Sequence, residues 1–200
     1  AISNPVDIIA HYIYKLSGLP KNQVIGTGTA IDSARLQNMI AQTVNVDPRS
    51  VHAYSMGEHG DSQMVPWSTV TIAGKPFYDV IADNKELVGD VDLDELVYRT
   101  TQEGWEIFNR KGTTYYGIAT ACVGVIKAIL NDENRIIPVS TLLEGEYGER
   151  DVYAGVPTVL NRSGAYDVLE IHMTPGELAR FKESTRVIRE YTDRIMKLNL

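Results

Sequence analysis

The chain has 200 residues, of which 44% are hydrophobic and 22% charged, and its formal net charge is −7. This composition excludes a disordered chain and a collagen-like fibre, and the length suffices for a sizeable core. The acidic balance argues against nucleic acid and against an anionic membrane as partners. Cys122 is the only cysteine, which excludes a disulfide framework and fits a reducing cytoplasm, where we expect the protein to work.

The start of the chain has no basic segment followed by an apolar stretch, so we expect no signal peptide. The longest apolar tract, residues 115–130, contains Lys127 and is too short to span a bilayer. It indicates a buried helix. No pair of His or Cys residues has the spacing of metal ligands beside a carboxylate, so we expect no metal.

The first predicted elements alternate between helix and strand. Asn4 followed by Pro5 predicts a helix start, with Asn4 as the cap and Pro5 at the first helical position. Gly18 predicts the end of this helix. The elements expected next are a strand at 22–27, a helix at 31–44, and strands at 51–56 and 67–72.

The later part of the chain predicts long helices and an antiparallel sheet. Residues 93–130 are expected to be helical, with an interruption near Lys111 and Gly112. Thr174 to Glu177 forms a capping box with Pro175 at the first helical position, which predicts a helix to the end. The sheet strands are expected at 136–143, 158–160 and 168–171. The fold class is therefore α/β passing into α+β.

A glycine-bearing turn lies between the strand at 22–27 and the following helix. The run Gly26–Ile31 is similar to a dinucleotide fingerprint, but Ile31 stands where the third glycine belongs. Asp47, about twenty positions on, precedes a proline in a loop and does not end a second strand. We therefore interpret the run as a tight strand-to-helix turn that holds no phosphate.

Asp32, Arg35 and His59 form a stronger candidate site. Asp32 and Arg35 project from one face of a first helical turn, and His59 lies between glycines that let the backbone turn. A histidine that moves protons needs an acid to fix its tautomer, and an arginine fork suits a carboxylate. The alternative is a capping Asp, a surface Arg and a loop His, and spacing alone does not decide between them.

Four runs of the sequence, taken together, closely resemble the bacterial L-lactate dehydrogenases. They are Asn4–Asp7, Gly26–Arg35, Gly57–Ser62 and Lys111–Ile118, in the order and spacing of that family. The resemblance covers essentially the whole chain. It implies that residues 1–28 are a remnant of a Rossmann-type dinucleotide-binding domain and that residues 29–200 are the α+β substrate-binding domain of lactate/malate dehydrogenases.

The resemblance implies a role for each matching residue. His59 matches the acid/base that exchanges a proton with the substrate's C2 oxygen, Asp32 its carboxylate partner, and Arg35 the group that holds the substrate carboxylate. The implied reaction is hydride transfer between NADH and pyruvate or L-lactate, in glycolysis and fermentation. Further matches are Asn4 and Thr114 at the substrate, and Ile2, Ser3, Asn4, Thr27 and Ile118 at the NAD cofactor.

The resemblance also implies a homotetramer and an allosteric site. Many bacterial members bind fructose 1,6-bisphosphate between subunits through an Arg and a His. His52 stands at the histidine position, but Gln37 stands where the Arg is expected. Losing that bidentate phosphate donor weakens such a site, so we expect weak or absent activation.

The family's chain is longer at its N-terminus, where it carries the dinucleotide fingerprint, an acidic residue for the ribose and a mobile loop with an Arg. These features are absent from the 200 residues, so we expect the chain as given to lack competent cofactor binding, and the strand at 22–27 to leave an unpaired edge. Two alternatives stay open. One is a sister dehydrogenase for malate or a branched hydroxy acid, with Gly104 leaving room in the pocket; the other is a non-catalytic oligomerisation fragment.

Overall fold

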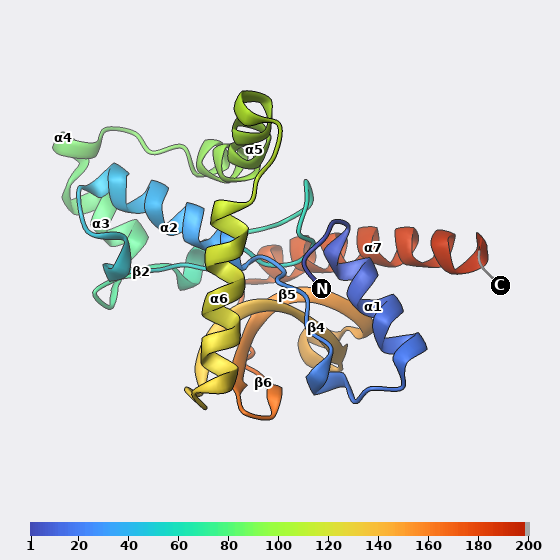
Figure 1. The fold of residues 1–200 in the computed structure, drawn as a ribbon. Coiled ribbons are helices and arrows are strands. Elements are labelled where there is room, and N and C mark those ends of the chain that lie inside the picture. Colours follow the sequence, from blue (N-terminus) through green and yellow to red (C-terminus); the bar gives the residue numbers. More distant parts are fainter. Residues whose placement is uncertain (199–200) are drawn as a thin grey trace.

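The computed structural model describes residues 1–198, which form two antiparallel sheets with helices around them (Figure 1). The larger sheet has the order β4-β5-β6 and the smaller one β1-β2-β3. The strands are β1 (Val51–His52), β2 (Thr71–Ile72), β3 (Lys75–Pro76), β4 (Arg135–Glu144), β5 (Arg150–Asn161) and β6 (Gly164–Val168). The helices are α1 (Val6–Ser17), α2 (Ala30–Val44), α3 (Phe77–Asp83), α4 (Lys85–Val88), α5 (Leu93–Lys111), α6 (Tyr116–Leu130) and α7 (Pro175–Leu198).

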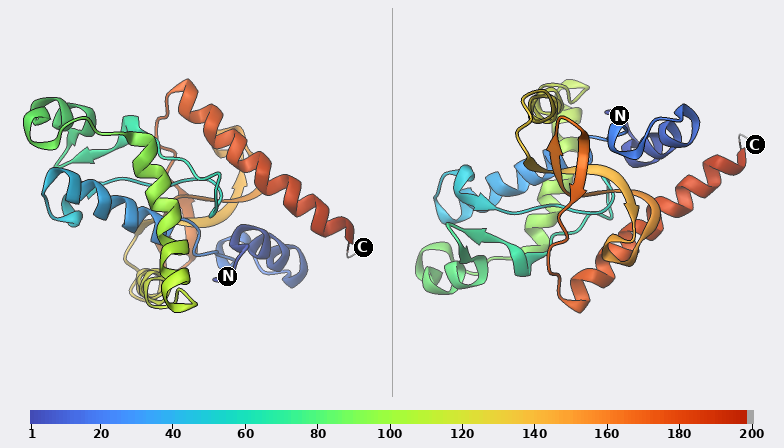
Figure 2. Two further views of the ribbon diagram at one scale, coloured as in Figure 1. Left: turned by 90° about the horizontal axis from the view of Figure 1, so that it is seen from above. Right: turned by 90° about the horizontal axis from the view of Figure 1, so that it is seen from below.

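Strand β5 separates two apolar clusters because successive side chains of a strand point to opposite faces. Val152, Ala154 and Val156 pack with Phe181 of α7 on one face. Tyr153, fully buried, packs with Ala10 of α1 on the other. The views in Figures 1 and 2 show α7 on one side of this sheet and α6 on the other. The larger sheet is therefore covered on both faces.

A third cluster joins α2 to the smaller sheet and to α5. Leu36 and Ile40 of α2 are fully buried and pack with Val70 and Phe77. Leu96 of α5 closes the same cluster. This packing fixes α2, whose first two turns carry Asp32 and Arg35.

Among the described helices, none combines the length and apolarity needed to cross a bilayer.

The predicted interruption of the long helix and the predicted capping box are confirmed. Gly112, with a φ of 76°, ends α5, and α6 begins four residues later. At the start of α7, the Glu177 N–H donates to Thr174 Oγ1 at 3.3 Å, and the Thr174 N–H donates to Glu177 Oε2 at 2.8 Å. Both helix boundaries therefore follow from local sequence chemistry.

The predicted start of the first helix is wrong by one position. Helix α1 begins at Val6, so Pro5 is the capping residue, and no side chain caps the helix. Pro5 has an extended backbone, with a ψ of 108°, which places it outside the helix. Asn4 therefore has no capping role.

The predicted strand at 22–27 is also wrong. Residues Lys21–Gln23 form a 3-10 turn, and only Gly26 pairs with the larger sheet, through reciprocal backbone hydrogen bonds to Ser140 of 2.9 and 3.0 Å. The Ala1 amino group donates to the Ile25 carbonyl, and the Thr27 N–H donates to the Ala1 carbonyl. The flanking groups thus bond to Ala1 and not to a neighbouring strand.

Each remaining strand prediction overlaps a strand of the structure, but most of the predicted bounds are wrong, and the one at 168–171 shares only Val168 with its strand. The region 51–56 contains β1 and a single antiparallel bridge from Met56 to Met64. The region 67–72 begins as a 3-10 turn and ends as β2. In the larger sheet, β5 is far longer than residues 158–160, and β6 ends at Val168, where the prediction began.

Candidate active site

Asp32 and His59 form the centre of the site. Asp32 lies in the first turn of α2 and is 2% exposed. Its Oδ2 lies 2.6 Å from Nδ1 of His59, which comes from the loop between β1 and β2. A hydrogen bond to Nδ1 fixes the ring and leaves the other ring nitrogen for a reacting atom. The side chain of His59 keeps 19% of its surface exposed.

The environment of His59 favours its protonated form. Burial by itself lowers the pKa of His59, but the hydrogen bond and the negative charge of Asp32 outweigh that effect, with Asp7 adding to them. The pKa of His59 is therefore raised above its ordinary value. A histidine held in this way donates a proton near neutral pH.

Arg35 shares the carboxylate of Asp32. Its Nη1 lies 3.3 Å from Asp32 Oδ1, while Oδ2 of the same carboxylate faces His59. The side chain of Arg35 is 11% exposed. Gly104 of α5 lies beside this guanidinium, and a Cβ added there would be in contact with it, 3.4 Å from Nη1. The structure thus brings together all three residues predicted for acid–base and carboxylate chemistry.

Three consecutive amides hold the loop that carries His59. The Gly57 N–H donates to the Gly155 carbonyl of β5 at 2.9 Å. The Glu58 N–H donates to Ser184 Oγ of α7 at 2.8 Å. The His59 N–H donates to Asp7 Oδ2 of α1 at 2.9 Å. Parts of the chain that are far apart in sequence therefore position this loop together.

The residues predicted near the cofactor lie at two places. Ile2 is 52% exposed, and Ser3 and Asn4 are exposed beside it, while Thr27 is 6% exposed. The backbone bonds of Ala1 hold this N-terminal segment against residues 25–27. Ile118 is half-buried in the first turn of α6, at the second place.

Thr114 and Asn4, the other predicted substrate residues, are not joined to the centre. Thr114 is exposed in the connection between α5 and α6. Among the hydrogen bonds of the described residues, none links Thr114 or Asn4 to His59. Their substrate role stays a prediction.

The two residues predicted for bisphosphate binding are neighbours. His52 is exposed on β1. The side-chain amide of Gln37, on α2, donates to the carbonyl of Ala53 at 3.0 Å. Gln37 is thus engaged with the backbone of the residue after His52.

The turn at Gly26 and Gly28 packs closely against β4. A Cβ on Gly28, which has a φ of 51°, would lie 2.4 Å from the backbone nitrogen of Ser140. A Cβ on Gly26 would lie 2.8 Å from the Ser140 side chain. The glycines are required by close contact with β4, which supports the interpretation as a tight turn.

Sequence reasoning missed Asp7 and Ser184. Asp7 belongs to the Asn4–Asp7 run, and it is buried on the same side of α1 as Val6 and Ala10. An acidic residue among apolar, buried helical positions could have indicated a functional role for Asp7. The first turn of a helix also favours an acid through the helix dipole, however, so the sequence did not distinguish the two. Nothing in the sequence distinguishes Ser184 from other serines.

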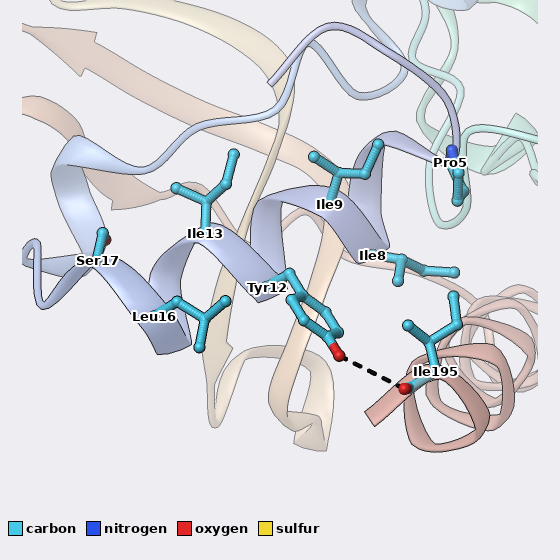
Figure 3. A pocket seen from close by; sticks show the side chains of 8 residues that line it. All are labelled: Pro5, Ile8, Ile9, Tyr12, Ile13, Leu16, Ser17 and Ile195. Carbon is cyan, nitrogen blue, oxygen red and sulfur yellow. Dashed lines mark hydrogen bonds between the residues drawn. The ribbon is translucent and has the colours of Figure 1, made fainter. Parts of the chain in front are cut away.

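A groove of about 580 Å³ lies between α1 and the end of α7, away from this chemistry. Figure 3 shows the isoleucines of α1 around it and the Tyr12 hydroxyl, which donates to the Ile195 carbonyl. None of the described residues that line it is an Asp, Glu, His, Lys or Arg. Elsewhere in the described part, no three His, Cys, Asp or Glu side chains are grouped as metal ligands.

A comparison with protein families decides what this arrangement belongs to. The family model for the alpha/beta C-terminal domain of lactate/malate dehydrogenase matches residues 29–198. The chain belongs to the lactate/malate dehydrogenase family. The family's C-terminal domain is an α/β domain, which agrees with the predicted fold class.

This member of the lactate/malate dehydrogenase family is similar to proteins named L-lactate dehydrogenase. It is 52% identical over 189 residues to L-lactate dehydrogenase 3 of Bacillus cereus, covering 94% of this chain and 60% of the relative. It is 47% identical over 195 residues to L-lactate dehydrogenase 1 of Bifidobacterium longum, covering 98% and 62%. The chain thus spans about 60% of the length of the relatives it matches.

Solved structures agree with these relatives. The crystal structure of the minor L-lactate dehydrogenase from Enterococcus mundtii, in its ligands-bound form, superposes with a TM-score of 0.92 at 41% identity. The match covers 97% of this chain and 62% of that one. The described fold is therefore that of a lactate dehydrogenase over the part compared.

Proposed function

We propose that this chain is the substrate-binding and acid–base part of an L-lactate dehydrogenase, which transfers a hydride between NADH and pyruvate or L-lactate. The observation that carries the proposal is the Asp32 carboxylate, which binds Nδ1 of His59 through one oxygen and Arg35 through the other. The names of the relatives support the choice of L-lactate.

Reduction of a 2-keto acid needs a proton on the oxygen at C2 as well as a hydride on the carbon. His59 donates that proton from its free ring nitrogen, and Asp32 stabilises the charged ring before the transfer. In the oxidation of L-lactate, the same nitrogen accepts the proton. The hydrogen bond at Nδ1 holds the ring in one orientation for both directions.

The carboxylate of the substrate needs a partner that fixes its direction. The Arg35 guanidinium offers two parallel N–H donors, which bind a carboxylate with defined geometry. Asp32 lies on one side of this fork and Gly104 on the other. A substrate held in this way presents C2 close to His59, which lowers the entropic cost of reaction.

The exposed side chains near the N-terminus fit the nicotinamide end of NAD. Ile2, Ser3 and Asn4 offer an apolar contact, a hydroxyl and an amide, and Ile118 offers an apolar surface. When bound, NADH supplies the hydride. The Gly26–Gly28 turn lacks the third glycine of a dinucleotide fingerprint and packs closely against β4, so we do not assign the pyrophosphate to it. We assign the exposed residues to the nicotinamide alone.

A fusion protein tests the proposal. Residues 1–200 replace the matching part of the Bacillus cereus relative, and rates are measured with NADH and pyruvate, oxaloacetate or a branched keto acid. We expect pyruvate to be fastest, and His59→Gln to slow turnover roughly 10²- to 10⁴-fold. Faster turnover of oxaloacetate or the branched acid would identify a sister enzyme. A fusion that folds, binds NADH and turns over none of them would contradict the proposal.

We also infer a homotetramer working in the cytoplasm. Exposed apolar side chains on and after α1 support association: Ile13, Leu16 and Leu19 are 40%, 76% and 44% exposed.

A bisphosphate site at His52 stays a proposal, and the site is weakened by Gln37. The native mass of the fusion protein tests the tetramer, and a monomer would contradict it. Association without turnover would favour the oligomerisation fragment.

A further inference from the structure

Asp7 is the only charged acceptor among the three that hold the His59 loop. It is 3% exposed, and its Oδ2 accepts the His59 N–H at 2.9 Å. Its other oxygen is buried beside the hydroxyl of Ser140 on β4, which lowers the pKa of Asp7. Holding one amide needs only a neutral oxygen, as Ser184 shows for Glu58. A buried carboxylate is costly even beside a hydroxyl, so the need to hold one amide does not explain it.

The charge of Asp7 acts on the imidazole as well as on the backbone. Asp7 and His59 each stabilise the charged form of the other. Burial raises the pKa of Asp7 to about 6, although the Ser140 hydroxyl and the His59 N–H oppose the shift.

The other groups that face the pair come from several elements. Asp32 and Arg35 of α2 act on His59 with opposite signs, and Glu58 of the loop acts on Asp7. Strand β4 contributes Ser140, β5 the Gly155 carbonyl and α7 Ser184, none of which is charged. Asp7 is therefore the second carboxylate beside Asp32 that acts on the histidine.

We propose that Asp7 is a positioning residue for His59: its carboxylate holds the His59 backbone from α1 and acts as a second negative charge on the imidazole. This rests on the proposed function, in which His59 is the acid–base residue. Two helices then control the histidine separately. Asp32 of α2 orients the ring, and Asp7 of α1 fixes the backbone and helps the ring to keep its proton.

Two substitutions of Asp7 separate these effects. Asp7→Asn keeps an oxygen for the amide but removes the charge, and Asp7→Ala removes both. Asp151→Asn is the matched control, because Asp151 also contacts α1, through Lys15, but lies outside the site. The ring nitrogens of His59 are titrated by NMR in the 200-residue chain, with His59→Gln for assignment. Deuterium exchange of the His59 amide is measured beside that of Glu58.

We expect Asp7→Asn to lower the midpoint of the His59 titration and to leave its amide exchange unchanged. Asp7→Ala lowers the midpoint and speeds exchange at His59 more than at Glu58. Asp151→Asn changes neither. An unchanged midpoint in Asp7→Asn would overturn the proposal, and that variant decides alone if Asp7→Ala fails to fold.

These measurements use neither NADH nor pyruvate. A shifted midpoint together with an inactive fusion protein would reject the dehydrogenase and leave the role of Asp7 intact. An active fusion protein with an unshifted midpoint would support the dehydrogenase and reject the role of Asp7.

Discussion

A Cβ atom placed on Gly104 would lie 3.4 Å from Nη1 of Arg35, so α5 passes beside the guanidinium. The same guanidinium bonds to Asp32. The proposed carboxylate-binding fork thus lies between α5 and an acid. A side chain at residue 104 would contact it.

Gly104→Ala tests this contact. We expect a rise in KM for pyruvate on the order of a few-fold in the fusion protein, because the added methyl contacts the fork and narrows the space beside it. Stability rises at the same time by up to about 1 kcal/mol, since alanine favours a helix interior. Gly124→Ala in α6 is the control, because no atom lies within 4 Å of its added Cβ. Equal KM values for both variants would contradict the prediction.

Gly57→Ala is expected to disrupt the His59 loop. Gly57 has a φ of 90°, and an added Cβ would lie 2.3 Å from Ser184 Oγ. We expect a loss of more than about 3 kcal/mol in the free energy of unfolding. Gly74→Ala has a similar φ of 82° with open space around it, so it loses only about 1–2 kcal/mol. Denaturant unfolding measures both, and similar losses would show that the contact with Ser184 is unimportant.

Asp7 makes stability depend on pH. Its pKa is about 6 in the folded chain against an ordinary 3.8, so between these values the folded state binds more protons than the unfolded state. The free energy of unfolding therefore falls by about 3 kcal/mol as pH rises through this window. The raised pKa of His59 acts in the same direction at higher pH.

Asp7→Asn removes the first of these two contributions. We expect its melting temperature, relative to the parent, to rise more at pH 8 than at pH 4. Thermal unfolding at the two values measures this, and Asp151→Asn is again the control. An equal effect at both pH values would show that the carboxylate is not held charged in the interior.

Fructose 1,6-bisphosphate is expected to activate the fusion protein weakly or not at all. Gln37 provides no guanidinium, and its amide is bound to the Ala53 carbonyl. Gln37→Arg supplies a bidentate phosphate donor beside His52, so we expect activation to appear or increase. Initial rates with and without the bisphosphate measure it. Strong activation of the parent at low concentration would contradict this prediction.

The 200-residue chain by itself is expected to bind NADH weakly. Its glycine turn lacks the third glycine of a dinucleotide fingerprint and packs against Ser140, so we expect only the nicotinamide end of NADH to find partners. Calorimetric titration of the chain, with the fusion protein as the positive control, measures the affinity. Tight binding by the chain alone would contradict the expectation.

Local chemistry made much of the fold predictable. The capping box at Thr174 fixes the start of α7, and the positive φ at Gly112 fixes the end of α5, whatever lies around them. The strand at 22–27 failed because its partners are Ala1 and Ser140, which lie far away in sequence. An apolar run does not reveal such partners.

The site was predictable only in part for the same reason. The shared helix turn of Asp32 and Arg35 follows from their spacing. The contact from Asp32 to His59 joins residues 27 positions apart. It could be predicted only from the resemblance to the bacterial L-lactate dehydrogenases. Asp7 lies in a motif that implies no role for it, because it becomes a hydrogen-bond acceptor only when α1 packs against the His59 loop.

The loop at His59 also carries a consequence for the order of folding. Its hydrogen bonds join residues 27, 52 and 126 positions apart in sequence. Contacts at such separations form late, because long stretches of chain must be ordered first. A growing polypeptide therefore cannot complete the proton-transfer centre until Ser184 has been synthesised. Partly made chains that end before Ser184 hold the histidine loop without one of the three hydrogen bonds that position its backbone.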